Sequence, residues 1–143
     1  MTLGKPPLTD HPVDVGHRSE AAIQAELIKR GYRVLVPLGV NQRYDLVVDV
    51  GGRFVTAQCK TARLRKGALH FSTRSTQSAR SGVQFRNYSG EVDLFLVYSP
   101  DTDCVYGVPV EEAAEGQMSL RIEAPQNCQR RGIRWARDFL LPA

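Results

Sequence analysis

Two strand-like runs joined by a pair of glycines constrain the fold of this chain more than any other feature. The runs are Tyr44–Val50 and Arg53–Lys60, and Gly51-Gly52 stands between them. Two glycines between β-like segments are a strong signal for a hairpin with a two-residue loop, because that loop needs positive φ angles. The pattern therefore predicts two antiparallel strands with a fixed register.

The register of this hairpin gathers three polar side chains at one end. Counting outward from the glycines places Asp45 opposite Gln58. Directly opposed side chains on one face of a sheet have Cβ atoms roughly 4.5–5.5 Å apart. Because side chains alternate along a strand, Lys60 shares the face of Gln58, whereas Cys59 points to the other face. The spacing alone predicts a cluster of an acid, an amide and an ammonium group.

A helix is predicted from Gly16 to Arg30, with Gly31 as its stop. Ile23 and Leu27 form an apolar stripe on this helix. Glu20 precedes Ile23 by three residues and therefore lies on the same side. A carboxylate on the side of the helix that packs against the protein is unexpected, and it indicates that Glu20 has a functional role.

The hairpin face of Asp45 also carries Val47, Phe54 and Thr56, which is the kind of surface that a helix covers. We expect the N-terminal helix to dock there and to bring Glu20 toward Asp45. Two acids in a partly buried place repel each other unless a cation lies between them. Oxygen ligands around a hard divalent ion suit Mg²⁺, so the sequence predicts a metal site.

The residues around such an ion have distinct expected roles. The amide oxygen of Gln58 and the backbone carbonyl of Cys59 would complete the ligands that Glu20 and Asp45 provide. A divalent ion polarises a phosphodiester and lowers the pKa of water. Lys60 would hold or activate that water and offset negative charge in the transition state. The cluster thus favours hydrolysis of phosphate esters.

Further strand-like runs follow the hairpin and one precedes it. An N-terminal lead-in of residues 1–15 and a single domain of residues 16–143 are expected, because the length suits one hydrophobic core. The order of a helix, a β-meander and then further strands and helix predicts an α/β fold with a mixed sheet. The remaining predicted segments are strands at Tyr32–Pro37, Ala68–Arg74, Val92–Ser99, Cys104–Val110 and Ser119–Glu123, a short helix at Val110–Glu115, and a C-terminal helix or extended tail at Ile133–Leu140.

The charge of the chain is segregated. The net charge is +4, but the segment Val50–Gly90 has eight basic residues and no Asp or Glu, so the remainder carries −4. A solvated surface normally mixes both signs, and a segregated basic segment indicates a polyanionic partner such as nucleic acid.

The cysteines and the hydropathy indicate the cellular compartment in which the protein is expected to function. Cys59, Cys104 and Cys128 are odd in number and form no CxxC pair, so neither a disulfide framework nor a zinc site is indicated, and a reducing cytoplasm fits best. No apolar run approaches the roughly 20 residues of a membrane span. The first residues contain no apolar stretch of the kind that a signal peptide needs.

The ordered set of Glu20, Tyr44-Asp45-Leu46 and Gln58-Cys59-Lys60 resembles the PD-(D/E)XK nuclease superfamily. The second half-motif of that superfamily normally has Asp or Glu, any residue and Lys. The Gln-x-Lys form of this chain resembles the branch of intron-associated homing endonucleases, and the stretches from Gln58 to Ser75 and from Val92 to Val110 are also similar to that branch.

This resemblance implies a restriction-endonuclease-like core, in which a mixed central sheet is flanked by an N-terminal helix and a further helix. It implies a metal site at Glu20, Asp45 and Gln58 and a catalytic lysine at Lys60. Gln58 leaves one carboxylate fewer than usual, so we expect one Mg²⁺ ion, for which Mn²⁺ would substitute. The implied activity is that of a hydrolase acting on ester bonds, a Mg²⁺-dependent endonuclease for double-stranded DNA.

Basic and polar residues around the cluster are the candidate DNA contacts. The segment from Thr73 to Arg80 is predicted to form a loop that enters a groove of the DNA, since its Ser, Thr, Gln and Arg side chains suit phosphates and base edges. The candidates that bind DNA are Gln42, Arg43, Arg63, Arg65, Lys66, Arg74, Gln77, Arg80 and Arg86.

A single centre cuts one strand per encounter, so cutting both strands predicts a homodimer or homotetramer. Three other functions stay open. A Holliday junction resolvase of the same fold would recognise a junction by its shape. A non-catalytic nucleic-acid-binding module with a nuclease fold would retain function without Asp45 and Lys60, and Gln58 keeps that hypothesis open. A restriction or repair nuclease is not excluded.

Overall fold

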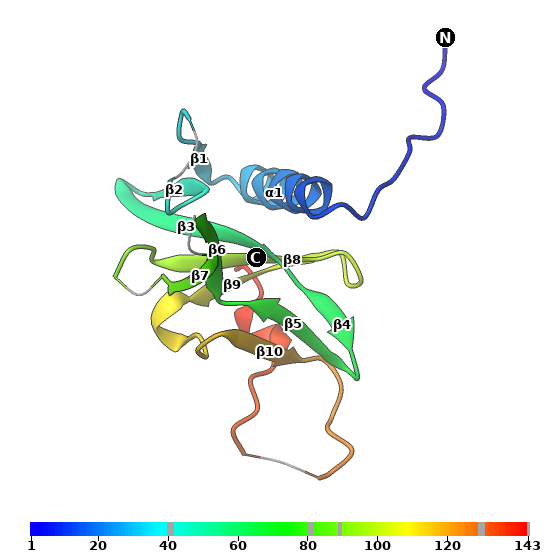
Figure 1. The fold of residues 1–143 in the computed structure, drawn as a ribbon, viewed down its shortest axis with the longest axis vertical. Helices are drawn as coiled ribbons and strands as arrows, with labels where there is room; N and C mark the ends of the chain where they lie inside the picture. Colours follow the sequence, from blue (N-terminus) through cyan, green and yellow to red (C-terminus); the bar gives the residue numbers. More distant parts are fainter. Residues whose placement is uncertain (40–41, 80–81, 89, 129–130, 143) are drawn as a thin grey trace.

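The computed structural model describes residues 1–39, 42–79, 82–88, 90–128 and 131–142, with only the backbone of residues 75–79 and 82–87. Its elements form three layers (Figure 1): one helix lies on one side of a five-stranded sheet, and a smaller sheet lies on the other side. No helix in the described part of the chain is long and apolar enough to cross a membrane. The predicted α/β class with a mixed sheet is confirmed.

The N-terminal helix α1 spans Pro12–Lys29 and begins four residues earlier than predicted. Its N-cap is His11, whose side chain accepts a hydrogen bond from the Val13 N–H at 3.3 Å, and Pro12 supplies a preset φ angle at the first helical position. The last four residues of the expected lead-in of residues 1–15 therefore belong to the helix. The helix ends where Gly31 adopts a φ of 89°.

The central sheet has the order β1-β2-β3-β8-β9. Only β3 and β8 run parallel, and the other neighbours are antiparallel, so the sheet is mixed. The strands are β1 (Arg33–Leu35), β2 (Leu46–Val50), β3 (Arg53–Thr61), β8 (Leu94–Ser99) and β9 (Cys104–Pro109).

The glycine hairpin between β2 and β3 has the predicted register. Val50 pairs with Arg53 and Leu46 with Ala57, so the next step outward sets Asp45 against Gln58. Gly51 and Gly52 have φ angles of 62° and 89°. Residues with a Cβ rarely adopt such angles, which explains why the chain has glycine at both positions.

Helix α1 docks on the opposite face of the hairpin from the one predicted. Ile23 and Leu27 pack against Leu46, Val48 and Ala57, and this core also includes Leu96 and Val105. The predicted face stays open at its hairpin end, where Phe54 is 62 % exposed. The reason is hydrophobic area: the face of Leu46, Val48 and Ala57 has an unbroken apolar row, whereas Asp45, Asp49 and Thr56 interrupt the other.

The other side of the central sheet is covered by a three-stranded sheet of order β10-β5-β4. Phe95, Val97 and Val108 of the central sheet pack against Leu69, Phe71, Met118 and Leu120 of the small one. Short 3-10 helices η1 (Val110–Glu112) and η2 (Ala136–Phe139) take the places of the two predicted later helical segments. The strands of the small sheet are β4 (Arg63–Arg65), β5 (Ala68–Ser72) and β10 (Gln117–Arg121).

The segment predicted to be a DNA-binding loop is instead a two-stranded ribbon. Strands β6 (Arg74–Ala79) and β7 (Gly82–Asn87) pair antiparallel over six residue pairs and join neither of the two other sheets. Polar composition favoured a loop, but Ser, Thr and Gln also suit a ribbon whose backbone groups are satisfied by cross-strand pairing.

Candidate active site

The candidate active site lies where β3 extends beyond the start of β2. Strand β2 begins at Leu46, and the Asp45 N–H still donates to the Ala57 carbonyl at 2.9 Å. One carboxylate oxygen of Asp45 then accepts the Cys59 N–H at 2.8 Å. The Asp45 side chain thus replaces the next residue of β2 in the hydrogen-bond ladder. Its carboxylate therefore lies at the edge of the sheet, where both faces have access to it.

Helix α1 brings Glu20 to this edge from the opposite face. The preceding residue, Ser19, is 2 % exposed, and its hydroxyl is 2.5 Å from the hydroxyl of Thr61 at the end of β3. This hydrogen bond fixes the helix beside the last residues of β3. Sequence reasoning missed it, although Ser19, Ile23 and Leu27 are spaced by four along the buried stripe, and a serine there needs a partner.

The negative charge of Asp45 destabilises the charged form of Glu20. Burial raises the pKa of Glu20, the negative charge of Asp45 raises it further, and His17 opposes the shift. Burial also raises the pKa of Asp45, whereas the Cys59 N–H bond and the Lys60 ammonium oppose that rise. The Asp45 charge thus acts on Glu20 although the helix lies on the face opposite to the predicted one, and a metal site shared by the two residues stays a prediction.

The Lys60 side chain lies on the side of the central sheet that the small sheet covers. Its Nζ donates to the Arg74 carbonyl at 2.8 Å and lies 4.8 Å from the ring centroid of Tyr88. Burial lowers the pKa of Lys60 to about 8, and the nearby Arg43 lowers it while Asp45 opposes the shift. Lys60 is therefore a half-buried ammonium with a proton that it can release near neutral pH.

A comparison with models of protein families shows the relationship of this chain to known proteins. The family model described as PD-(D/E)XK endonuclease matches residues 11–142. The chain belongs to the PD-(D/E)XK endonuclease family. The superfamily predicted from Asp45, Gln58 and Lys60 is therefore confirmed. No curated protein matches this chain.

A solved structure described as that of the bacterial homing endonuclease I-Ssp6803I is similar to this PD-(D/E)XK protein. The two are 23 % identical, the match covers 92 % of this chain and 89 % of the other, and the TM-score is 0.72. At this identity the similarity shows that the two proteins share a fold.

The donor atoms at the edge of this PD-(D/E)XK fold suit a hard divalent ion. Within the described residues no group of three or more His, Cys, Asp or Glu side chains gathers, so further ligands of an ion at Glu20 and Asp45 would come from other groups. A strand residue directs its N–H and its carbonyl to the same edge, and the Cys59 N–H faces Asp45. The Cys59 carbonyl therefore faces the same edge. These oxygens, with the Gln58 amide, fit the preferences of Mg²⁺.

The Cys59 thiol has no part in this donor set. It lies in the core beneath α1, and burial together with the charges of Asp45 and Glu20 raises its pKa. A protonated thiol is neither a nucleophile nor a metal ligand. The predicted role of Cys59 thus concerns its backbone only.

Arg43, one of the predicted DNA contacts, is engaged within the protein. Its guanidinium forms an ion pair with Glu91 and lies 4.4 Å from the ring centroid of Tyr88. Tyr88 is buried in the core between the two sheets, so its ring is not available for stacking on a base. Arg43 and Lys60 both contact this ring, which brings two cations to one side of the site. Neighbouring Gln42 is exposed.

The other predicted DNA contacts fall in three places. Arg63 and Arg65 are exposed on β4, and Lys66 is exposed in the turn after it. Arg74 is the first residue of the ribbon, and its carbonyl accepts from Lys60. Gln77 and Arg86 belong to the ribbon strands, but their side chains lie outside the described part, and Arg80 lies outside the described residues altogether.

Proposed function

We propose that this endonuclease hydrolyses phosphodiester bonds of double-stranded DNA with a divalent ion, Mg²⁺ or in its place Mn²⁺, and that it is similar in activity to homing endonucleases. The observation that carries the proposal is the pair of carboxyl groups whose pKa values are both raised beside the Lys60 ammonium. Such a pair is unfavourable without a cation. It stands in a chain of a nuclease family.

Glu20 and Asp45 would hold the ion, with the Gln58 amide oxygen and the Cys59 carbonyl as further ligands. The chemistry that such an ion supplies is polarisation of the scissile phosphate and acidification of a nearby water. The Cys59 N–H bond orients the Asp45 carboxylate before any ion arrives. The Asp45 carboxylate would therefore be held in place by the sheet, whereas Glu20 would come from helix α1.

Lys60 would stabilise the negative charge that grows on the phosphate oxygens during attack. The Arg74 carbonyl and the ring of Tyr88 fix its Nζ, so little reorganisation is needed at the moment of reaction. With a pKa of about 8, most of the Lys60 side chains carry a proton at pH 7, and that proton can also be donated.

The ribbon of β6 and β7 would enter the major groove, which admits a two-stranded β-ribbon. Its first residue is bonded to Lys60, so the ribbon begins at the active site. Arg74, Gln77 and Arg86 belong to this ribbon and are the proposed contacts within it. Gln42 would contact the DNA backbone near the start of β2.

We further propose that the enzyme acts as a homodimer or homotetramer, since one centre of this kind cuts one strand per encounter. Sedimentation of the protein on a cleavable duplex, with Ca²⁺ replacing Mg²⁺, would give the number of chains per DNA. One chain per duplex would contradict the proposal.

The activity is tested with supercoiled plasmid and a library of linear duplexes carrying a randomised target, each with Mg²⁺, Mn²⁺ or EDTA. We expect cut ends with either metal and none with EDTA. Lys60→Met preserves the length of the side chain without its charge and should leave binding but remove cleavage. Cleavage by Lys60→Met at the wild-type rate would contradict the proposal. A four-way junction in parallel distinguishes a junction resolvase.

A further inference from the structure

The three-stranded sheet has one buried face and one open face. Leu69, Phe71, Met118 and Leu120 point into the core, and each is at most 2 % exposed. The alternate positions form the outer face, and Arg63, His70 and Ser119 lie side by side across the three strands. We define the outer sheet face by six residues on it, which are Arg63, Arg65, His70, Gln117, Ser119 and Arg121.

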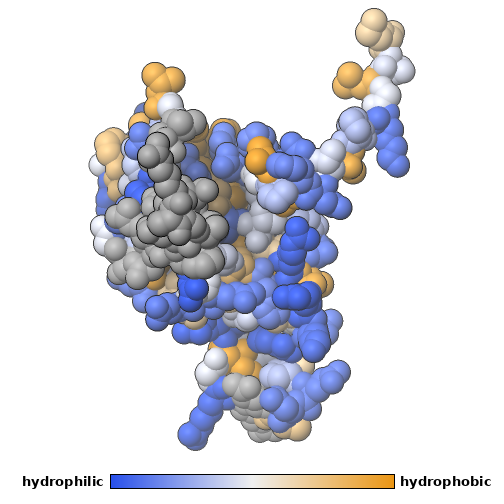
Figure 2. Space-filling view, viewed as in Figure 1, coloured by the Kyte–Doolittle hydropathy of each residue, from blue (hydrophilic) through white to orange (hydrophobic). Residues whose placement is uncertain are grey.

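The outer sheet face carries the charges of Arg63, Arg65 and Arg121. Within the described residues, carboxylate ion pairs exist for Arg30 and Arg43, and none exists for Arg63, Arg65 or Arg121. Two acids lie at the rim. The Asp101 carboxylate accepts the Leu64 N–H at the β4 edge, and Glu123 follows the end of β10. Figure 2 shows hydrophilic side chains gathered over the region of β4 and β5.

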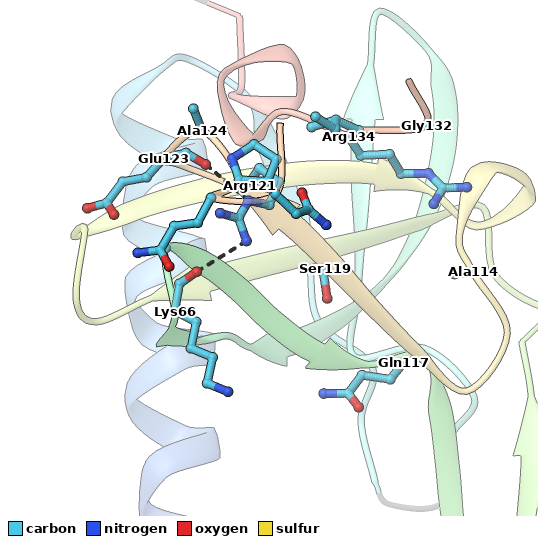
Figure 3. A pocket seen from close by; sticks show the side chains of 14 residues that line it. Lys66, Ala114, Gln117, Ser119, Arg121, Glu123, Ala124, Gly132 and Arg134 are labelled. Atoms are coloured by element: carbon cyan, nitrogen blue, oxygen red, sulfur yellow. Dashed lines mark hydrogen bonds between the residues drawn. The ribbon is translucent and has the colours of Figure 1, made fainter. Parts of the chain in front are cut away.

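Two hollows follow this face, and they share Gln117. The smaller, about 330 Å³, is lined by Thr61, Arg63, Arg65 and His70 among others. The larger, about 930 Å³, includes Lys66, Ser119 and Arg121 (Figure 3). Thr61 is the last residue of β3, so the first hollow begins at the end of the strand that carries Lys60. The outer sheet face is therefore continuous with the candidate active site.

Arg121 is held in position by the backbone at the far end of this surface. Its Nε donates to the Glu123 carbonyl at 3.0 Å, and one terminal nitrogen donates to the Lys66 carbonyl at 3.1 Å (Figure 3). A guanidinium has five N–H donors, so three of them remain for an anion. A guanidinium that is fixed in this way loses little entropy when it binds a phosphate.

We infer that the outer sheet face binds the phosphate backbone of the DNA that flanks the cleavage site. The inference rests on the proposed function, and it assigns the DNA-binding surface to two segments far apart in sequence, β4 with β5 and β10. Charge complementarity and continuity with the end of β3 identify the occupant as DNA backbone. The sequence predicted Arg63, Arg65 and Lys66 as contacts, but it did not indicate Arg121, Gln117 or His70.

The test measures the affinity for a duplex without a target site over a range of salt concentrations. Each lost phosphate contact lowers the slope of log affinity against log salt by about 0.9. The double variant Arg63→Gln, Arg65→Gln should therefore lower the slope by nearly two. The variant Gln117→Lys adds a charge to the centre of the outer sheet face and should raise the slope by nearly one. Because Gln117 is exposed, this variant does not depend on disturbing the core.

The matched control is the double variant Arg33→Gln, Arg53→Gln. Both arginines are exposed on the central sheet, away from the outer sheet face. This control variant should therefore leave the slope of log affinity against log salt unchanged. The inference is overturned if wild-type protein binds and cuts DNA while the Arg63, Arg65 and Gln117 variants keep its salt slope. It is also overturned if these variants change the sedimentation of the protein alone, because the face would then be a subunit interface. If wild-type protein neither binds nor cuts DNA, the proposed function fails as well.

Discussion

The two ends of the β2–β3 hairpin differ in how their strands end and in the chemistry that follows from it. At the glycine end, Val50 and Arg53 are paired, and the Asp49 carboxylate accepts the Gly52 N–H at 2.8 Å. At the other end β2 stops at Leu46 while β3 continues to Thr61. There a carboxylate completes the ladder. The difference indicates that a site forms where one strand outlasts its partner, because side chains then occupy places that the backbone leaves empty.

The largest expected difference between the two ends is catalytic. Asp45→Asn keeps an acceptor for the Cys59 N–H but removes a charged metal ligand, so Mg²⁺-dependent cleavage should fall by about a thousandfold or more, at or beyond the upper end of the effect of one electrostatic group. Asp49→Asn, on the same strand at the glycine end, is the matched control and should keep wild-type rates. Single-turnover cleavage rates measure both. Equal losses in the two variants would show that the ends do not differ.

The second difference concerns stability. The pKa values of Glu20 and Asp45 are both raised in the folded protein, so their ionisation opposes folding, and stability is lost as pH rises through those pKa values. At pH 7 in EDTA, Asp45→Asn should therefore raise the melting temperature, because the neutral amide removes the charge that opposes folding. Asp49→Asn should not.

Added Mg²⁺ should raise the melting temperature of the wild type and leave that of Asp45→Asn unchanged, because only the wild type retains the pair of charges. Calorimetry in EDTA and in Mg²⁺ measures both effects. A lower melting temperature for Asp45→Asn in EDTA would mean that the charged carboxylate stabilises the edge of the sheet.

How far the sequence predicts this molecule also differs between the two ends. Two glycines at one spacing determine the turn, the register and the meeting of Asp45 with Gln58, because these follow from local geometry. The face on which α1 docks was predicted wrongly, since that choice depends on apolar area summed over β2, β3, β8 and β9. The hydrogen bonds of Asp45 and Lys60 were beyond prediction because they depend on where a strand ends and on a carbonyl from another element.

A third difference lies in how each end is attached to the rest of the protein. Ser19→Ala leaves the half-buried Thr61 hydroxyl without its partner and should cost about 1–2 kcal/mol of unfolding free energy. Because Glu20 follows Ser19, cleavage should also slow by about tenfold, within the range for residues that orient metal ligands. Urea denaturation and single-turnover rates measure these effects.

The double variant Ser19→Ala, Thr61→Val should recover part of the lost stability, because both polar partners are then gone. Additive losses in the double variant would mean that the two hydroxyls do not interact.

The smallest effect on activity is expected at the glycine end. Gly52→Ala must adopt a φ of 89°, which strains any residue with a Cβ and should cost about 1 kcal/mol or more. Cleavage at a temperature where the variant is folded should be unchanged, since the turn lies at the opposite end of the hairpin from Asp45. A large loss of the cleavage rate in folded protein would link the turn to the site and remove the contrast.

Metal binding tests the central claim most directly, because it does not require a target sequence. Mn²⁺ titrated into the protein on a short duplex, with free Mn²⁺ followed by electron paramagnetic resonance, reports the ions bound per chain. We predict one ion for the wild type and for Asp49→Asn, and none at the same concentrations for Glu20→Gln or Asp45→Asn. Retention of the wild-type ion by both of these variants would contradict the account.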